Sequence, residues 1–348
     1  MMSSTHIPHW LKSVAWFWCS LCLLLVTVSA QPIATGLMAY ATINEKTFYV
    51  LGGARPSGIG ISFTYPPQFY SLDLTQHGWN TSNPPWKMMR YPLALQPDSV
   101  ASSNYSIADS PDNRTLDVWV VVDPNMLVKY DFGNDTWTQV PVNNSVHGTG
   151  VRAVTDPTTG LVYFPGGGGS NSDMVVYDSN TGLFTNGPSN SSVVTVEPFY
   201  SFTWNSQLNK FIYFTGNVST ANVSTVNPFY EFTPSTGQWS QMVTYGSTPP
   251  PQYRSCLISA LNGSKMILFG GDDGSVSTSS LYILDVPTMT WTQATSAFEG
   301  RSGMACAVSG NSFVVWGGFT ARDSLPFRGV SAEPLVYNLT SQEWTTTY

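Results

Sequence analysis

The chain has few charged side chains, few cysteines and few histidines for its 348 residues. Asp, Glu, Lys and Arg together make up 10%, and 21 acidic residues outnumber 14 basic ones to give a net charge of −7. Because nucleic-acid binding depends on basic side chains that neutralise phosphates, this composition excludes a nucleic-acid binder. Four cysteines are too few for a disulfide scaffold, so burial of apolar side chains must stabilise the fold.

The first 30 residues have the pattern of a secretory signal peptide. Lys12 precedes an uncharged run rich in Trp, Leu and Val, which ends in the small-residue pattern Val28-Ser29-Ala30. We expect cleavage before Gln31, a mature domain over 31–348 with a net charge of −8, and a location outside the cell or on its surface. The alternative is an uncleaved anchor, because the run approaches the ~20 residues that span a bilayer.

Glycosylation sequons agree with secretion, because Asn-x-Ser/Thr sites accept glycans only in the secretory route. We expect several of the ten to be occupied: Asn80, Asn104, Asn113, Asn134, Asn143, Asn190, Asn217, Asn222, Asn262 and Asn338.

Removal of the signal leaves two cysteines, Cys256 and Cys306. Cys256 lies 15 residues before Gly271, whereas Cys306 lies 12 residues before Gly318, so the two occupy different levels of neighbouring repeats. An odd offset also turns side chains to opposite faces of a strand. We expect two buried free thiols.

A three-part order recurs along the mature chain. An apolar run ends in Gly-Gly, a second apolar run ends at a polar turn, and an aromatic residue follows, as in 266-MILFGG-271, 281-LYILD-285 and Trp291. Repeat two lacks the doublet, repeat three closes with Phe, and repeat four has Gly216-Asn217. The order occurs six times, and consecutive closing aromatics are 47 to 58 residues apart. The closing aromatics are Trp79, Trp137, Phe184, Trp239, Trp291 and Trp344.

Each repeat predicts four strands and no helix. The first of the four is a weak strand before the doublet run, such as 254-RSCLISAL-261. Units of this size cannot bury both faces alone and are stabilised by stacking around an axis. We expect blades one and six to be complete from their own segments, with no strand exchanged between the termini. Aromatics at matching places should form the inter-blade core: Trp79, Trp137, Trp239, Trp291, Trp344, Tyr70, Tyr130, Tyr177, Tyr230, Tyr282 and Tyr337.

The order apolar-Gly-Gly, Tyr-x-x-Asp, Trp resembles the kelch repeat. That resemblance implies an all-β protein, a six-bladed β-propeller of four-stranded kelch-type blades, over essentially the whole mature chain. It also implies a binding scaffold that recognises a protein or glycan, without catalysis, through loops at one end of the axis. We expect the long inserts 54–68, 218–228 and 319–334 to project from that end.

The enzyme alternative is a carbohydrate oxidase similar to galactose oxidase, a secreted copper enzyme whose propeller is built from kelch repeats. The resemblance implies a copper site of two His, two Tyr and a Cys linked to one tyrosine. The mature chain has only His77 and His147, placed at the rim of blade one and before the first strand of blade three. Two imidazoles so placed do not share a metal, so we expect no metal and no cofactor.

Three arginines occupy matching places in the repeats. Arg254 and Arg301 stand 17 residues before the second Gly of their doublets, and Arg152 stands 15 before Gly167. In kelch propellers this region opens the innermost strand, so we expect these arginines, with Tyr253 and His147, to line the axial mouth and bind an acidic partner. The alternative is that they cap strand ends or pair with local carboxylates.

Overall fold

The structure is a computed structural model that describes residues 30–57, 62–95, 105–121, 126–142, 146–168, 173–188, 193–194, 196–216, 227–274, 276–322 and 325–348. The predicted signal peptide, except Ala30, lies outside the described residues. So do five of the ten sequons: Asn104, Asn143, Asn190, Asn217 and Asn222.

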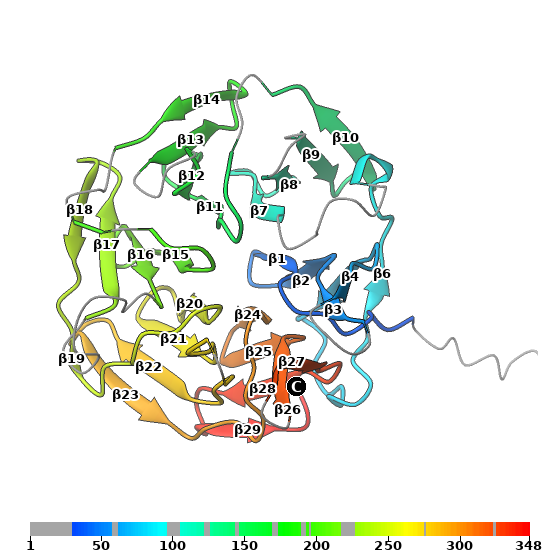
Figure 1. The fold of residues 1–348 in the computed structure, drawn as a ribbon, viewed down its shortest axis with the longest axis vertical. Coiled ribbons are helices and arrows are strands. Elements are labelled where there is room, and N and C mark those ends of the chain that lie inside the picture. The colour runs from blue at the N-terminus through cyan, green and yellow to red at the C-terminus, as the bar shows by residue number, and fades with distance from the viewer. Residues whose placement is uncertain are drawn as a thin grey trace, which may run out of the picture.

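Six antiparallel sheets form a ring of blades around a central axis (Figure 1). Blade one contains β1 (Ala39–Ile43), β2 (Thr47–Leu51), β5 (Phe69–Asp73) and β6 (Lys87–Met88). Blade two contains β7 (Tyr105–Asp109), β8 (Thr115–Val120), β9 (Met126–Asp131) and β10 (Thr136–Val140). Blade three contains β11 (Val154–Thr155), β12 (Leu161–Pro165), β13 (Met174–Asp178) and β14 (Leu183–Asn186).

The second half of the ring repeats the same order. Blade four contains β15 (Ser201–Asn205), β16 (Lys210–Phe214), β17 (Phe229–Thr233) and β18 (Gln238–Gln241). Blade five contains β20 (Cys256–Ala260), β21 (Lys265–Phe269), β22 (Leu281–Asp285) and β23 (Thr290–Ala294), and β19 (Tyr245–Gly246) pairs in parallel with β23. Blade six contains β24 (Ala305–Ser309), β25 (Ser312–Trp316), β28 (Leu335–Asn338) and β29 (Glu343–Thr345).

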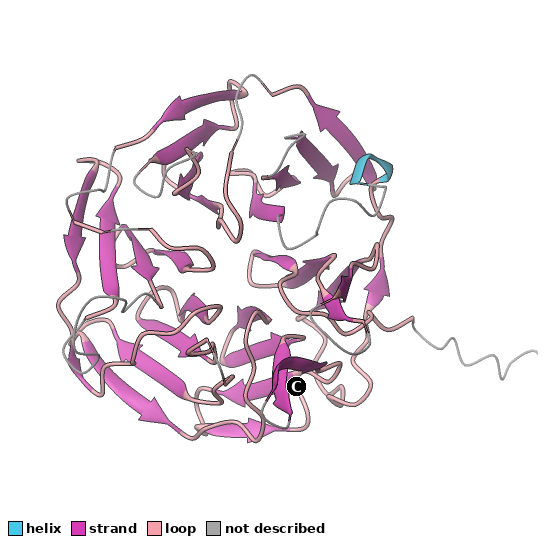
Figure 2. Cartoon of the chain, in the orientation of Figure 1, coloured by secondary structure: helices cyan, strands magenta, loops and turns pink. Residues whose placement is uncertain are grey.

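The protein is therefore the all-β, six-bladed β-propeller that the repeat pattern predicts. Two of the long inserts form hairpins of their own, β3 (Arg55–Pro56) with β4 (Phe63–Thr64) and β26 (Phe319–Arg322) with β27 (Leu325–Val330). The described part of the chain has no α-helix, only the 3-10 turn η1 (Leu93–Leu95), which the sequence did not predict (Figure 2). Within the described ranges, no helix is long and apolar enough to cross a bilayer.

The glycine doublets turn the chain sharply at the end of the second strand of three blades. At Gly270 and Gly271 the φ angles are 63° and 98°, a region that side chains with a Cβ rarely adopt. A Cβ on Gly271 would lie 2.8 Å from the carbonyl oxygen of Tyr253. The doublet therefore allows the backbone to approach its neighbour closely, as the sequence pattern indicates.

Six apolar clusters fill the ring, one between each pair of adjacent blades. Trp291 of blade five packs on Phe229 of blade four at 4.9 Å between ring centroids, and Trp344 of blade six packs on Phe269 of blade five at 5.4 Å. The Trp344 indole also donates a hydrogen bond to the Thr295 carbonyl oxygen at 2.8 Å. Seven of the repeated aromatics are buried in these clusters, and Trp137, Trp344, Tyr230 and Tyr282 are half-buried against them, as predicted for inter-blade core. A fully buried aromatic contributes about 1.5–3 kcal/mol.

Blades one and six each take all four strands from their own segments, so the prediction of no exchanged strand is confirmed. The seam between them has one feature that the sequence did not predict. Trp79 lies outside a blade strand because its segment pairs with the chain's last residues. Gly78 N–H donates to the Tyr348 carbonyl at 2.6 Å, Tyr348 N–H donates to the Trp79 carbonyl at 3.0 Å, and the Tyr348 and Trp79 rings stack at 4.8 Å.

The prediction of two free thiols is wrong: Cys256 and Cys306 form a disulfide between β20 and β24, with Cα atoms 6.4 Å apart. Cys256 is paired with Phe269, one residue before its doublet, and Cys306 with Val315, two residues before its doublet. The cysteines therefore differ by one level rather than three. Two residues of the apparent offset come from hairpin turns of different length, 261–264 in blade five and 310–311 in blade six.

The second error concerned the direction of the two side chains. Residues at matching places of the blades point the same way round the ring. Two side chains that meet across a blade interface must therefore come from opposite faces of their strands, which an odd offset provides. Cys256 and Cys306 both lie in the cluster between blades five and six, whereas Ala305 and Ala307 lie in the cluster between blades six and one.

Candidate functional site

The two ends of the axis differ. All innermost strands run in the same direction, because the six blades repeat one topology. The glycine doublets and the hairpins β3–β4 and β26–β27 lie where these strands begin, and we call this end the loop face. The opposite end carries the turns that follow the innermost strands, such as Asn44–Glu45 and the turn with Asn113, and we call it the turn face.

Arg301 lies at the loop face but its side chain is 0% exposed. Its guanidinium donates to the Gly317 carbonyl at 3.3 Å and to the Glu333 carbonyl at 2.8 Å, and it pairs with Glu299 at 3.1 Å. Burial lowers the pKa of Arg301 to about 10, and the Glu299 carboxylate opposes that decrease. Arg301 therefore ties strand ends of blade six together and presents no surface to solvent, as in the alternative that the arginines cap strand ends.

Arg254 is also engaged by the protein itself. Its Nε and Nη2 atoms donate to the two carboxylate oxygens of Asp272 at 2.7 and 2.5 Å, and Asp272 is 2% exposed. The Arg254 guanidinium also lies 5.6 Å from the centre of the Phe199 ring. Tyr253 forms a two-way backbone bridge with Asp272, with N···O distances of 2.9 Å in both directions. The alternative in which these arginines pair with local carboxylates therefore describes Arg254 and Arg301.

The loop-face mouth of the axis is narrow. The pocket beside Arg254 and Phe199 has a volume of about 30 Å³, which is room for one or two water molecules. His147 lies at the same face, exposed, with its N–H bonded to the Gly167 carbonyl at 2.8 Å, and it does not line this pocket. Of the five predicted site residues, Arg152 and Arg254 line this small pocket, whereas Arg301, Tyr253 and His147 do not.

Arg152 also reaches beyond this pocket, because its side chain extends along the axis. It lines the small loop-face pocket and also a larger cavity on the other side. Its guanidinium lies 4.7 Å from the centre of the Tyr40 ring, a cation–π geometry. The Arg152 N–H donates to the Tyr200 hydroxyl at 3.0 Å, which fixes the backbone from which the side chain projects.

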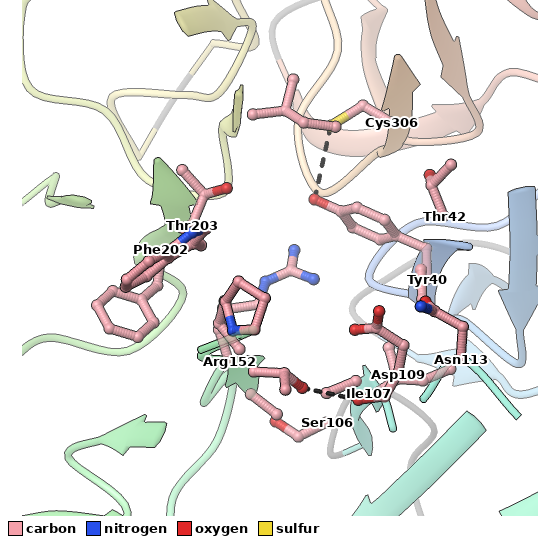
Figure 3. A pocket seen from close by; sticks show the side chains of 18 of the residues that line it. Tyr40, Thr42, Ser106, Ile107, Asp109, Asn113, Arg152, Phe202, Thr203 and Cys306 are labelled. Carbon is pink, nitrogen blue, oxygen red and sulfur yellow. Dashed lines mark hydrogen bonds between the residues drawn. The ribbon is translucent and has the colours of Figure 1, made fainter. Parts of the chain in front are cut away.

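The larger space, which we call the axial cavity, has a volume of about 440 Å³ and extends to the turn face. Its wall is contributed by the innermost strands of all six blades (Figure 3). Polar groups from blades one to four include Tyr40, Asp109, Asn113, Arg152 and Thr203. The Tyr40 hydroxyl lies 3.6 Å from the Cys306 Sγ atom, so the disulfide forms part of the wall.

Asp109 is the acidic group inside this cavity. Burial raises the pKa of Asp109 to about 6, and the carboxylate of Asp117 adds to the increase. Asp117 itself is 1% exposed and is neutralised by Lys129 at 2.7 Å. The charge of Asp109 is therefore poorly solvated when the carboxyl is ionised.

Apart from Arg152, sequence reasoning missed the residues that make this cavity. The available signal was the acidic end of the otherwise mostly apolar strand 105-YSIAD-109, together with polar residues on alternate positions of 39-AYATI-43. The innermost strand of a blade has its two faces toward the two neighbouring blades and one edge toward the channel, so polar residues on it indicate a solvent-filled centre.

His77 and His147, the histidines of the described residues, lie in different blades and near opposite faces. His77 stacks on Tyr348 at 5.4 Å at the rim of blade one, whereas His147 is in blade three at the loop face. Within the described residues, no group of three or more His, Cys, Asp or Glu is placed to hold a metal ion.

Five sequons fall on described residues. Asn80, Asn134 and Asn262 are exposed, and Asn113 and Asn338 are partly exposed. Asn80 and Asn338 accept hydrogen bonds from the backbone two residues later, at 2.9 and 2.8 Å. Asn113 lies at the rim of the axial cavity.

A closed ring of six blades with repeated glycine doublets and inter-blade aromatics defines a six-bladed β-propeller. Residues 200–347 match the family model described as the KLHDC2/KLHL20/DRC7 Kelch-repeats domain, which confirms the kelch resemblance for blades four to six. Among solved structures the fold is similar to the structure of YjhT, with a TM-score of 0.64 and 13% identity, over 91% of this chain and 99% of that one. At that identity the similarity concerns the fold alone.

Two curated relatives match shorter stretches. A probable serine/threonine-protein kinase of Dictyostelium discoideum is 28% identical over 174 residues, which is 48% of this chain and 13% of the kinase. A Kelch repeat-containing protein of Arthroderma benhamiae is 28% identical over 102 residues, which is 26% of this chain and 15% of that protein. The chain thus spans only a small part of the relatives that it matches.

Proposed function

We propose that this protein is a non-catalytic scaffold, secreted or held at the cell surface, that binds another protein through its loop face. The kelch propeller fold is typical of protein-binding scaffolds, which supports the class of function. The signal-like residues 1–30 and the ten sequons support the location.

The observation that carries the proposal is the continuity of the loop face across blades five, six and one. The Ser277 hydroxyl of blade five donates to the Phe319 carbonyl of blade six at 3.2 Å, and Phe319 exchanges backbone hydrogen bonds with Ser302. The Phe319 ring meets Phe63 of blade one edge-on at 5.9 Å. Loops joined in this way present one preorganised surface, which lowers the entropic cost of binding.

This surface carries large apolar side chains that are open to solvent. Phe298 is 78% exposed and Val276 is 59% exposed, and both belong to loop-face segments of blade five. Exposed aromatic side chains are the usual anchors of protein interfaces. Because the adjoining pocket holds only about 30 Å³, this face suits a macromolecular surface better than a buried small ligand.

The same geometry favours a protein over an acidic glycan as the partner. An acidic glycan needs exposed cations with free hydrogen-bond donors, but Arg254 is held by Asp272 and Arg301 is buried with Glu299. Arg152 lies inside the axis, where the loop-face pocket has a volume of only about 30 Å³. An apolar surface instead gains affinity by removing side chains such as Phe298 from water.

The test compares Phe298→Asp with the matched variant Leu183→Asp, whose side chain is 51% exposed at the start of the outermost strand of blade three. Each protein is expressed in secretory cells, and bound extracellular proteins are quantified by mass spectrometry after affinity purification. We expect Phe298→Asp to reduce recovery of the specific partners at least tenfold and Leu183→Asp to leave it unchanged. Partners that are lost equally with both variants, or binding to a glycan array that Phe298→Asp does not affect, would contradict the proposal. A mature N-terminus at Gln31 in the medium tests the location.

A further inference from the structure

The axial cavity contains two opposite charges that have no ion-pair partner among the described residues. Asp109 enters it from the end of β7, and Arg152 enters it from the segment before β11. Figure 3 shows both side chains turned into the same space. The ion pairs of the described chain involve other carboxylates and cations, such as Asp117 with Lys129.

Charges kept apart in a partly desolvated cavity are unfavourable for the empty protein and favourable for a complementary ligand. Asp109 is half-buried in the cavity wall, and this loss of water raises the pKa of its carboxyl to about 6. A cationic group placed against this carboxylate therefore replaces solvation that the fold has taken away. A carboxylate placed against Arg152 gains charge-assisted hydrogen bonds in the same way.

Arg152 is held in position before any ligand arrives. The Tyr40 ring lies against the guanidinium at 4.7 Å, and the Tyr40 hydroxyl is itself in contact with Cys306 of the disulfide. Tyr200 bonds both the N–H and the carbonyl of Arg152, at 3.0 and 3.3 Å. The Tyr40 ring therefore holds the guanidinium and Tyr200 holds the backbone of Arg152. Among the described residues, no carboxylate pairs with the guanidinium N–H groups of Arg152.

We propose that the axial cavity binds a small zwitterion of the amino-acid type, with its carboxylate on Arg152 and its ammonium group on Asp109. The volume of about 440 Å³ is within the range of small-molecule sites. Phe202, Trp204 and Ile258 supply an apolar part of the wall for the ligand's side chain.

The charge distribution disfavours ligands with a single charge. A simple anion meets the Asp109 carboxylate and the exposed Glu45 at the rim, whereas a simple cation meets Arg152. A zwitterion satisfies both sites at once. The cavity extends to the turn face, at the opposite end of the axis from the protein-binding surface, so the two proposals stand or fall separately.

The experiment is isothermal titration calorimetry of the full mature chain with each of the twenty free L-amino acids. The amino acid that binds most tightly is then compared with its N-acetyl derivative, which lacks the ammonium charge, and with its amide, which lacks the carboxylate. Glucose serves as a neutral probe. We expect at least tenfold weaker binding of both derivatives and no binding of glucose. The absence of binding by all twenty amino acids, or tighter binding of glucose, overturns the proposal.

Two variants assign the contacts. Asp109→Asn should weaken binding of the free amino acid at least tenfold and leave binding of its N-acetyl derivative unchanged. Arg152→Gln should also weaken binding of the free amino acid at least tenfold, but it should leave binding of the amide unchanged. Lys87→Gln, exposed on β6, has the same charge change as Arg152→Gln and should bind like the wild type. Near-ultraviolet circular dichroism verifies that each variant is folded. If one variant does not fold, the other variant and the derivatives still decide the result. Unchanged amino-acid affinity in a folded Asp109→Asn or Arg152→Gln protein overturns the assignment.

Discussion

Arg254 and Arg301 stand at the same distance from their glycine doublets, yet their side chains differ in burial and in partners. Spacing predicts that both lie at the loop face, and both do. It does not predict that Arg301 is 0% exposed, because its acceptors Ser331 and Glu333 arrive from an insert 30 residues later in the chain. Position within a repeat is therefore readable from the sequence, whereas the burial of a repeat residue depends on loops that differ from blade to blade.

The burial of Asp109 in the axial cavity could likewise not be read from its position in the repeat. Its effect on the pKa of the carboxyl leads to a prediction about stability. Its folded pKa of about 6 exceeds the ordinary value of 3.8, so the folded state holds a proton that the unfolded state releases between these values. The free energy of unfolding should therefore decrease as the pH rises from 4 to 7, by at most about 3 kcal/mol from this group. The groups that face Asp109 are Asp117 of β8, itself paired with Lys129 of β9, and Arg152 across the cavity.

Asp109→Asn removes this ionisation, so we expect it to raise the free energy of unfolding at pH 7.5 by about 1–3 kcal/mol and to leave it nearly unchanged at about pH 3, below both pKa values. Urea unfolding at the two pH values measures the difference. Asp73→Asn is a control of opposite sign, because hydrogen bonds from Thr75 hold the pKa of Asp73 below its ordinary value. A loss of stability for Asp109→Asn at pH 7.5 would show that the carboxylate is well accommodated.

Among the elements, the strand hairpins were predictable from the sequence, but the lengths of their turns were not, and these lengths set the relative level of the two cysteines. The Gly-Gly pattern located the second strand of blades one, five and six correctly, since a doublet with positive φ ends each of them. The distances from Cys256 and Cys306 to their glycine doublets gave a wrong prediction of their relative level, because the turns 261–264 and 310–311 differ in length by two residues. Register must be counted through the paired strand rather than along the chain.

The disulfide between β20 and β24 joins the innermost strands of blades five and six across 50 residues of sequence. Closing a loop of that size in the unfolded chain contributes about 4 kcal/mol in the chain-entropy model, and measured contributions are typically 2–4 kcal/mol. We expect the double variant Cys256→Ala/Cys306→Ala to lose about 2–4 kcal/mol in urea unfolding under oxidising conditions. Reduced wild-type protein should resemble the variant, and equal stability of oxidised wild type and variant would contradict the prediction.

For the whole molecule, ring closure depends on the seam between blades six and one. The repeat pattern predicted complete blades, but it could not show that the last residues bond to the edge of blade one. Tyr348 stacks on Trp79 and donates from its hydroxyl to the Leu74 carbonyl at 2.7 Å. A residue beyond the last repeat has no counterpart in the other five blades, so periodicity contains no information about it.

Tyr348→Ala should therefore weaken the seam selectively. We expect a loss of about 1–3 kcal/mol in the free energy of unfolding, because both the ring stacking and the hydrogen bond disappear. Tyr348→Phe retains the stacking and should lose only about 1 kcal/mol. Hydrogen exchange should accelerate in β29 and around Trp79 before it accelerates in blades three and four. Uniform acceleration round the ring would argue against a local closure site.

The parallel pairing of β19 with β23 has a consequence for self-association. The outermost strand of a blade offers unpaired backbone N–H and C=O groups, which can template pairing with another molecule. In blade five, Tyr245 and Gly246 pair with Thr290 and Trp291, so part of this five-residue edge is already covered by the chain itself. The outermost strand of blade one is shortened to the two residues Lys87–Met88 and begins with a lysine. A covered edge and a short, charged edge both discourage the edge-to-edge stacking that leads from folded propellers to aggregates.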